Sequence, residues 1–458
     1  MKFEIKNLGP LKDAAIELGG LTVVCGKNNC GKTYLAYTLD TFLDTIEYNL
    51  NVPLRDPDFA SLYTKGEVCL DLQAYVAEYV RQIQETIPRF TNNLPRFLAM
   101  DSSRFDQTEV VVPLSPETVL NSLVCPSIDK GQATGVQIEM RPTSTATLVA
   151  RRQFASTTAT ISMQNVAEEL PTEKVVRDNA SRLLARLFNS SRKFPIFPKS
   201  FIITSERTGA TLFRSDLMSI KVRMDQAHGK VAIPTGYRGY GYQRPVEKDI
   251  EFVLELKRFL PCRGEVAERH PEILRYFATI AGGAYDFDES TDQIKFHPKG
   301  TNATLSLAES SSTVRALSEL FFYLKHKARR GHVLMIDEPE INLHPANQRK
   351  LARLFAMLVK AGIRVFVTTH SDYIVREINA LIRLGSLSDD VRRQLMERHG
   401  YGDVTTLTSE DVKMFVLENG YSHEVPFDHE SNAFAVSSFD DTIEQFNSLY
   451  DDLMDLGS

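Results

Sequence analysis

The chain has no tryptophan, and it lacks the residue spacings that bind structural metals. None of its ten histidines belongs to an HExxH pattern, and its five cysteines form no CxxC pair. Scattered cysteines in odd number exclude a disulfide framework and a zinc site, and they indicate reduced thiols. These cysteines are Cys25, Cys30, Cys69, Cys125 and Cys262.

Long apolar runs are also absent. No stretch of about 18 apolar residues is available to span a membrane, and the N-terminal MKFEIKNLGPL lacks the apolar segment of a signal peptide. We therefore expect a cytoplasmic protein without membrane contact. Its 458 residues, 43% of them hydrophobic, suffice for a large core and about two to four structural units.

The net charge of −6 is unevenly distributed. Residues 151–260 carry 19 Lys and Arg against 11 Asp and Glu, whereas residues 401–458 carry 13 acids and the single base Lys413. The basic segment 151–260 is suited to contact DNA, RNA or an acidic partner. The alternative is a solvated surface that faces the acidic tail.

Hydrophobic periodicity predicts a mixed α/β chain. The predicted strands and hairpins lie at 2–8, 14–25, 134–164 (an antiparallel meander), 200–204, 284–307, 332–337 and 364–369. The predicted helices lie at 32–48, across much of 50–125, at 166–189, 246–259 and 265–281, from Ser312 onward, and between the last two strands. A Gly/Tyr-rich loop is predicted at 235–245, before the helix at 246–259. The final helix places Ile443, Phe446, Tyr450 and Leu453 on one stripe.

The stretch VVCGKNNCGKT, residues 23–33, fits the phosphate-binding pattern GxxxxGK[ST] at every position. A predicted strand precedes it and a predicted helix follows it, so backbone N–H groups and the helix N-terminus converge on phosphate oxygens. Lys32 is expected to reach the β- and γ-phosphates, and the Thr33 hydroxyl to bind Mg²⁺. The predicted ATP-binding residues are Gly26, Lys27, Asn28, Asn29, Cys30, Gly31, Lys32, Thr33 and Tyr34.

The segment HVLMIDEPEINLHP, residues 332–345, is a buried strand that ends in Asp337 and Glu338. Beside a phosphate-binding loop, we expect Asp337 to order the Mg²⁺ shell and Glu338 to polarise the attacking water. The segment RVFVTTHSDYI, residues 364–374, delivers His370 to the end of the next strand, where it can contact the γ-phosphate. These residues predict ATP and Mg²⁺ as ligands, with Lys32, Glu338 and His370 as catalytic groups.

The order of these motifs resembles the ATP-binding-cassette (ABC) ATPases, in the soluble RecF/SMC/OLD branch. The likeness covers the first 50 residues and about 300–380 well, and the middle only loosely. It implies a P-loop NTPase fold of ABC-ATPase type, with a mixed sheet core, an antiparallel β subdomain and a helical insertion. It also implies a head-to-tail homodimer, or a higher even-numbered oligomer, in which each active site is shared.

By this resemblance, LAESSSTVRALSEL places Ser310, Ser311 and Ser312 at the signature that contacts the nucleotide of the opposite subunit. The family's glycine is absent there. Asn342, Leu343 and His344 match the D-loop. FIITSERTGA, residues 201–210, offers Glu206 and Arg207 as the possible Q-loop region, and a similar Ser-Glu-Arg stretch occurs in ATPases of anti-phage operons.

The resemblance divides the chain into five parts. These are an N-terminal ATPase segment (1–50), a helical insertion with a β meander (51–200), a loop and helical lobe (201–300), the signature-to-histidine segment (301–390) and an acidic C-terminal cap (391–458).

The motif set and length are similar to those of the stand-alone ATPases of anti-phage defence, PtuA of Septu and retron systems and AriA of PARIS. Such ATPases work with a separately encoded nuclease, and this sequence shows neither an HNH nor a Toprim pattern. The expected function is an ATP-hydrolysing sensor or scaffold that controls a separate nuclease or toxin effector. The alternatives are a RecF-like DNA-binding ATPase of repair or recombination, and a nucleotide-binding scaffold that hardly hydrolyses ATP.

Overall fold

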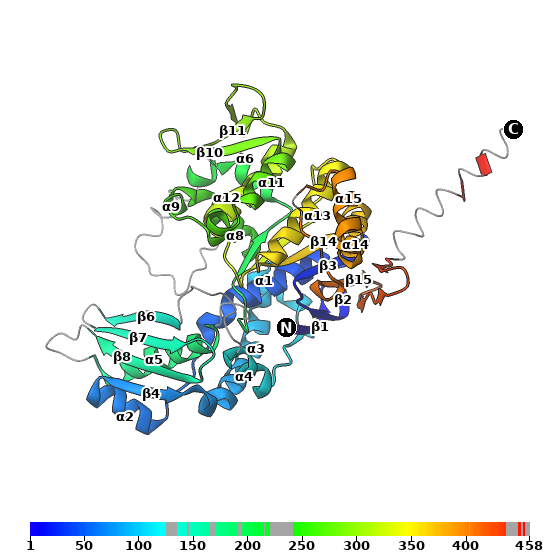
Figure 1. Cartoon of the computed structure of the whole chain (residues 1–458). Coiled ribbons are helices and arrows are strands. Elements are labelled where there is room, and N and C mark those ends of the chain that lie inside the picture. Colours follow the sequence, from blue (N-terminus) through cyan, green and yellow to red (C-terminus); the bar gives the residue numbers. More distant parts are fainter. Residues whose placement is uncertain are drawn as a thin grey trace.

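The computed structural model describes residues 1–124, 135–143, 146–164, 171–190, 195–214, 216–219, 241–402, 404–436, 448–449 and 452–453 (Figure 1). Within this part of the chain, no helix is long and apolar enough to cross a membrane. The predicted Gly/Tyr-rich loop falls largely outside these residues, as do Ile443, Phe446 and Tyr450 of the predicted apolar stripe.

A nine-stranded mixed sheet forms the centre of the molecule, in the order β5-β1-β2-β16-β15-β3-β14-β13-β9. The strands β15, β3, β14, β13 and β9 run parallel to one another. The strand bounds are β1 Lys2–Leu8, β2 Leu11–Glu17, β3 Leu21–Gly26, β5 Glu109–Val111, β9 Ser200–Ile203, β13 Val333–Asp337, β14 Arg364–Thr369, β15 Val412–Glu418 and β16 Tyr421–Glu424.

The parallel strands are covered on both faces, which explains their continuous apolar sequence. Val333 and Met335 of β13 belong to one hydrophobic core, which includes helix α1 (Lys32–Asn49). Leu334 and Ile336 of the same strand belong to a second core, built by helices α11 to α14. Alternate residues therefore point to opposite faces, as the two-residue period of a strand requires.

The predicted antiparallel meander is confirmed as β6 (Gly135–Thr143), β7 (Ala146–Gln153) and β8 (Thr158–Gln164). A fourth strand, β4 (Glu67–Asp71), pairs with β8 and comes from the region that the sequence predicted to be largely helical. Figure 1 shows this sheet at the lower left, well away from the lobe that holds β10 and β11 at the top. The predicted fold class, α/β with a mixed sheet core and an antiparallel subdomain, is confirmed.

The remaining helices and strands lie outside the central sheet. The helices are α2 Asp56–Lys65, α3 Val76–Phe97, α4 Pro116–Val124, α5 Glu173–Phe188, α6 Arg207–Leu212, α8 Arg244–Leu254, α9 Leu256–Phe259, α10 Glu265–Arg269, α11 Pro271–Ala281, α12 Ser312–His326, α13 Pro345–Lys360, α14 Asp372–Ser386 and α15 Asp389–Arg398. The small strands are β10 Gly283–Asp288, β11 Gln293–Pro298, β12 Leu305–Ser306, β17 Phe427–Asp428 and β18 Ala433–Phe434.

Several predicted elements differ from the observed ones. The single strand predicted at 14–25 is broken at Gly19-Gly20 into β2 and β3, where a Cβ on Gly20 would lie 2.9 Å from the Asp411 carbonyl oxygen. The helix predicted at 265–281 is divided between α10 and α11, because Pro271 cannot continue a helix from the preceding turn. The sequence also did not anticipate β15 and β16, which lie within the predicted acidic cap yet occupy the middle of the main sheet.

Candidate active site

The glycine-rich loop begins where β3 ends, at the carboxyl edge of the parallel strands. Its backbone turns through Gly26 (φ 155°), Asn29 (φ 63°) and Gly31 (φ 99°). A Cβ would lie 2.8 Å from the Leu417 carbonyl oxygen at Gly26 and 2.7 Å from Leu11 Cγ at Gly31. Only glycine therefore fits at these two positions, and the loop can fold tightly enough to surround a phosphate.

Helix α1 starts immediately after the loop, so its unpaired N–H groups face the same space. Lys32, its first residue, is buried, and its Nζ donates to the carbonyl oxygens of Gly26 and Lys27 at 2.9 Å each. The ammonium group is thereby held over the loop. This is the position from which it can meet the terminal phosphates of a nucleotide.

Thr33 and Asp337 meet although they are far apart in the sequence. The Thr33 hydroxyl donates to Asp337 Oδ2 at 3.0 Å, and the Thr368 hydroxyl of β14 donates to Oδ1. Burial raises the pKa of Asp337, and the two hydroxyl hydrogen bonds oppose that effect. A hydroxyl and a carboxylate at this spacing are oxygen donors of the kind that Mg²⁺ prefers, so these residues fit the predicted metal.

Glu338 comes directly after Asp337, and its backbone is left-handed (φ 49°), which turns its side chain away from the strand. Its N–H donates to both the carbonyl and the hydroxyl oxygen of Thr368, at 3.1 Å each. His370, at the end of β14, has its Nδ1 3.8 Å from Glu338 Oε1. The structure therefore brings the two predicted catalytic side chains to one place.

Glu340 completes this group, and the sequence analysis did not identify it. Its buried Oε1 accepts from the His370 N–H at 2.7 Å and from the Thr369 hydroxyl at 2.8 Å, and it lies 3.3 Å from His370 Nδ1. Glu340 thus holds the histidine in position, whereas the more exposed Glu338 faces the open side. The only signal in the sequence was the third acid of the run DEPE.

Of the predicted Q-loop residues, Arg207 is buried, and its guanidinium donates to three carbonyl oxygens. These belong to Thr204 (2.9 Å), Asp337 (3.0 Å) and Glu338 (2.9 Å). Arg207 therefore fixes the backbone that presents both acids. Glu206 accepts from the Tyr37 hydroxyl of α1 at 2.9 Å, which ties the end of β9 to the phosphate-loop helix.

The three predicted signature serines have different surroundings. The Ser310 hydroxyl is buried and donates to the Ser306 carbonyl oxygen at 2.7 Å. Ser311 is the N-cap of α12, where its Oγ accepts from the Val314 N–H at 3.3 Å. Ser311 and Ser312 are exposed at the start of this helix. Their contact with a second subunit stays a prediction.

The predicted D-loop lies against the start of the same helix. The Asn342 carbonyl oxygen accepts from the Thr313 hydroxyl at 2.7 Å, and Leu343 is buried. His344 is the N-cap of α13, with Nδ1 accepting from the Ala346 N–H at 3.2 Å. The acids Asp337 and Glu338 do not cap α13, so their place beside the phosphate loop is not explained by helix capping.

The other predicted ATP-binding residues line the loop itself. Lys27, Asn28 and Asn29 are exposed, and Cys30 is half-buried. The Tyr34 ring lies beside Gly9, in the turn between β1 and β2, so closely that a Cβ on Gly9 would be 2.6 Å from it. The part of these side chains in ATP binding stays a prediction.

A buried carboxyl pair lies next to this site. Asp249 of α8 accepts from the Thr204 N–H at 2.7 Å, and Glu319 of α12 is equally buried. Within the described part of the chain, Asp249 Oδ1 and both Glu319 oxygens have no donor. Burial raises the pKa of Asp249 to about 7 and that of Glu319 well above its usual range. The neighbouring Asp249 also raises the pKa of Glu319, and the nearby Arg207 opposes that effect.

The raised pKa of Asp249 predicts a measurable pH dependence of stability. Because the folded pKa of about 7 exceeds the ordinary 3.8, the stabilisation is complete below pH 3.8 and is lost as the pH rises through 7. Between pH 6 and pH 8, ionisation of Asp249 should lower the free energy of unfolding of the wild type by about 1 kcal/mol. We expect Asp249→Asn, which cannot ionise, to lack this decrease. Urea unfolding at both pH values measures it. The exposed Asp286→Asn should keep the wild-type pH dependence, and an Asp249→Asn variant that also keeps it contradicts the assignment.

In the structure, several cations of the basic segment 151–260 are buried or paired with acids. Arg152, Arg207 and Arg214 are buried; Arg152 is hydrogen-bonded to the Leu123 and Ser156 carbonyl oxygens, and Arg214 is paired with Asp292 at 2.6 Å. Lys248 is paired with the buried Asp40 at 2.8 Å. These cations stabilise the fold, so the charge excess of the segment overstates what is available to DNA or RNA.

Residues 1–110 and 263–375 match the AAA ATPase domain family. The matched residues lie on both sides of an insertion. The predicted P-loop ATPase fold is therefore confirmed. The matched residues include the phosphate loop, both acids and His370, whereas Arg207 and Asp249 come from the insertion.

Among solved structures, the chain is similar to three SMC heads. An SMC head bound to the C-terminal winged-helix domain of ScpA shares 12% identity at a TM-score of 0.33, covering 94% of this chain and 98% of that one. An SMC head with an extended coiled coil, bound to the C-terminal domain of ScpA from Pyrococcus furiosus, shares 14% identity at a TM-score of 0.32. This match covers 97% of this chain and 98% of that one. The SMC head from Thermotoga maritima shares 10% identity at a TM-score of 0.31, covering 93% of this chain and 98% of that one. No curated protein matches the chain.

Proposed function

We propose that the chain is an ATP-hydrolysing ABC-type switch, which closes as a head-to-tail homodimer and controls a separately encoded effector of an anti-phage defence system. The observation that carries the ATPase part is the convergence of Thr33, Asp337, Glu338 and His370 at one edge of the parallel strands. The defence role rests on the resemblance in motif order and length to the ATPases of Septu, retron and PARIS systems.

The chain's own residues divide the chemistry of hydrolysis between them. Lys32 and the loop N–H groups neutralise phosphate charge, and Glu338 orients the attacking water. His370, held by Glu340, contacts the terminal phosphate. Bound Mg²⁺, held by Thr33 and Asp337, supplies further charge neutralisation on the phosphate oxygens.

The dimer is proposed because each chain has one phosphate loop and one signature candidate. The exposed Ser311 and Ser312 begin α12, and Thr313 in the same turn is hydrogen-bonded to the D-loop carbonyl of Asn342. The D-loop starts four residues after Glu338. A partner's nucleotide that contacts α12 would therefore be coupled to the water-orienting acid of this subunit.

Lys32→Ala tests the proposed function. We expect it to abolish ATP-dependent dimerisation in native mass spectrometry and to weaken ATP binding at least about tenfold, because a buried cation is lost from the phosphate site. In cells that carry the chain with its neighbouring genes, we expect the substitution to abolish protection against phage. The exposed Lys65→Ala is the matched control. If Lys32→Ala weakens ATP binding but leaves protection against phage intact, the defence role is contradicted while the ATP site is supported.

A second candidate function, DNA binding, is favoured by a surface that only partly overlaps the predicted basic segment 151–260. The Gly264 N–H donates to the Lys325 carbonyl oxygen at 2.9 Å, which places α9 and the turn after it beside the end of α12 and the turn after that helix. Their exposed or half-exposed cations are Lys257, Arg258, Arg263, Lys325 and Arg329. If this surface binds duplex DNA, the affinity must fall steeply as salt is raised. A salt-independent complex with an effector protein favours the scaffold instead.

A further inference from the structure

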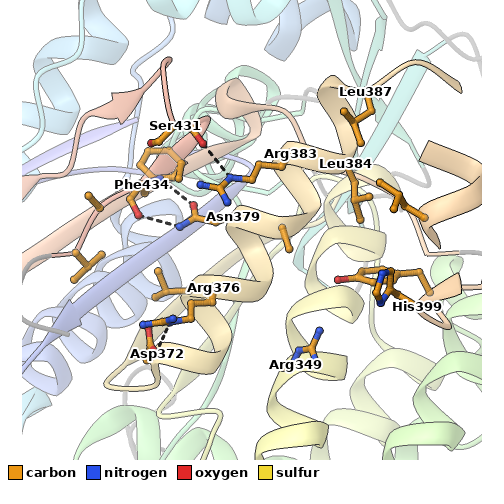
Figure 2. Close-up of a pocket in the computed structure, with 17 residues that line it drawn as sticks. Arg349, Asp372, Arg376, Asn379, Arg383, Leu384, Leu387, His399, Ser431 and Phe434 are labelled. Atoms are coloured by element: carbon orange, nitrogen blue, oxygen red, sulfur yellow. Dashed lines mark hydrogen bonds and ion pairs between the residues drawn. The ribbon is translucent and has the colours of Figure 1, made fainter. Parts of the chain in front are cut away.

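One groove in the described part of the chain shares no lining residue with the phosphate loop and has no part in the proposed reaction. It is a groove of about 740 Å³ between helices α14 and α15 and the segment 431–436 (Figure 2). Helix α14 begins at Asp372, two residues after His370, and forms the floor of the groove.

Polar contacts fix the segment that forms one wall. Asn379 and Phe434 exchange two hydrogen bonds of 2.9 Å, from the amide Nδ2 to the Phe434 carbonyl oxygen and from the Phe434 N–H to Oδ1. Arg383 Nε donates to the Ser431 carbonyl oxygen at 3.0 Å (Figure 2). The chain that follows residue 436 therefore leaves from a defined point on the groove.

The lining combines apolar and cationic side chains with one acid, Asp372, which is paired with Arg376 at 2.5 Å. Leu384, Leu387 and Leu395 supply the apolar surface, and Leu387 is 37% exposed. Arg376 and Arg383 are exposed along the same helix. Such a surface is suited to an amphipathic helix that carries acidic residues beside its apolar stripe.

The last 22 residues of the chain have this chemistry. Residues 437–458 include six acids and no Lys or Arg. The apolar residues of the predicted helix recur at helical spacing. The described residues 448–449 and 452–453 are helical, and Leu449 and Leu453, which share a helix face, are 54% and 57% exposed.

We propose that this groove binds the chain's own acidic segment, residues 440–456, as an amphipathic helix. Its apolar stripe packs on Leu384, Leu387 and Leu395, and its carboxylates face Arg376 and Arg383. Only residues 437–439 separate Val436, which lines the groove, from the segment, and they span at most about 10 Å. A linker this short gives a high effective concentration, so the contact forms within one chain.

Hydrogen exchange on the full-length protein tests this docking. We expect amides of residues 440–456 to exchange at least about tenfold more slowly in the wild type than in Leu387→Asp or Arg376→Glu. The reciprocal variant, Leu449→Asp with Leu453→Asp, should speed exchange in residues 384–399 of the groove. Arg393→Glu on α15, which is not part of the lining, is the control and should leave both regions unchanged.

Three results would overturn the proposal. The first is fast exchange of residues 440–456 in the wild type, and the second is protection that survives both groove variants. The third is protection that rises with protein concentration, since that would assign the groove to the tail of a second copy. Arg376→Glu alters an exposed side chain, so it remains informative if Leu387→Asp fails to fold.

Discussion

Glu338→Gln should lower the rate of ATP hydrolysis about 10²- to 10⁴-fold while ATP binding is retained. The amide keeps the size of the side chain and loses the charge that orients and polarises water. The backbone is fixed independently by the two bonds to Thr368 and by Arg207, so the local structure should survive. Phosphate release at saturating ATP, together with the amount of bound nucleotide, measures both effects.

The same variant should accumulate the closed assembly. Native mass spectrometry in ATP and Mg²⁺ should show an even-numbered oligomer, and co-expression with the neighbouring genes should reveal whether an effector is attached. Glu289→Gln, an exposed acid next to β10, is the matched control. If Glu338→Gln hydrolyses ATP normally and Glu340→Gln does not, the base is Glu340, and the assignment made from the motif is wrong.

Arg207→Met should lower the free energy of unfolding by about 3–5 kcal/mol, because it leaves buried polar groups without their charged partner. Three carbonyl oxygens lose their donor, and the Asp249 and Glu319 carboxyls lose the nearby positive charge. The midpoint of urea unfolding measures the change.

Arg258→Met is the control for Arg207→Met. Arg258 is exposed and paired with Glu255 at 3.5 Å, so its loss should cost less than about 1 kcal/mol. An equal effect of the two substitutions would contradict the bracing role of Arg207. A stable Arg207→Met protein that fails to hydrolyse ATP would instead assign Arg207 to the nucleotide.

The sequence predicted those parts of the site that depend on local spacing. The phosphate loop needs glycines at Gly26 and Gly31 whatever surrounds it, and buried strands that end in Asp337 or His370 are recognisable from a few residues. The role of Glu340 could not be predicted in this way, because it depends on the side-by-side placement of β13 and β14.

Contacts between distant segments were also beyond the sequence. Arg207 and Asp337 are 130 residues apart, and the pairing of Asp249 with Glu319 requires the packing of helices from two separate segments. Strand β15 was missed because its seven residues lie in a region dominated by acids. Its apolar residues, except the half-buried Val416, are nevertheless buried beside β3, as a central strand requires.

The position of β15 has a consequence for how the protein is made on the ribosome. Strand β3, which carries the phosphate loop, pairs with residues 364–369 on one side and 412–417 on the other. Both neighbours are synthesised more than 300 residues later, at rates of about 5–20 residues per second. The nascent chain thus carries an unpaired apolar strand for tens of seconds, during which chaperones have their opportunity to bind. A transcript truncated before residue 412 would encode every catalytic motif yet leave β3 with an open edge prone to aggregation.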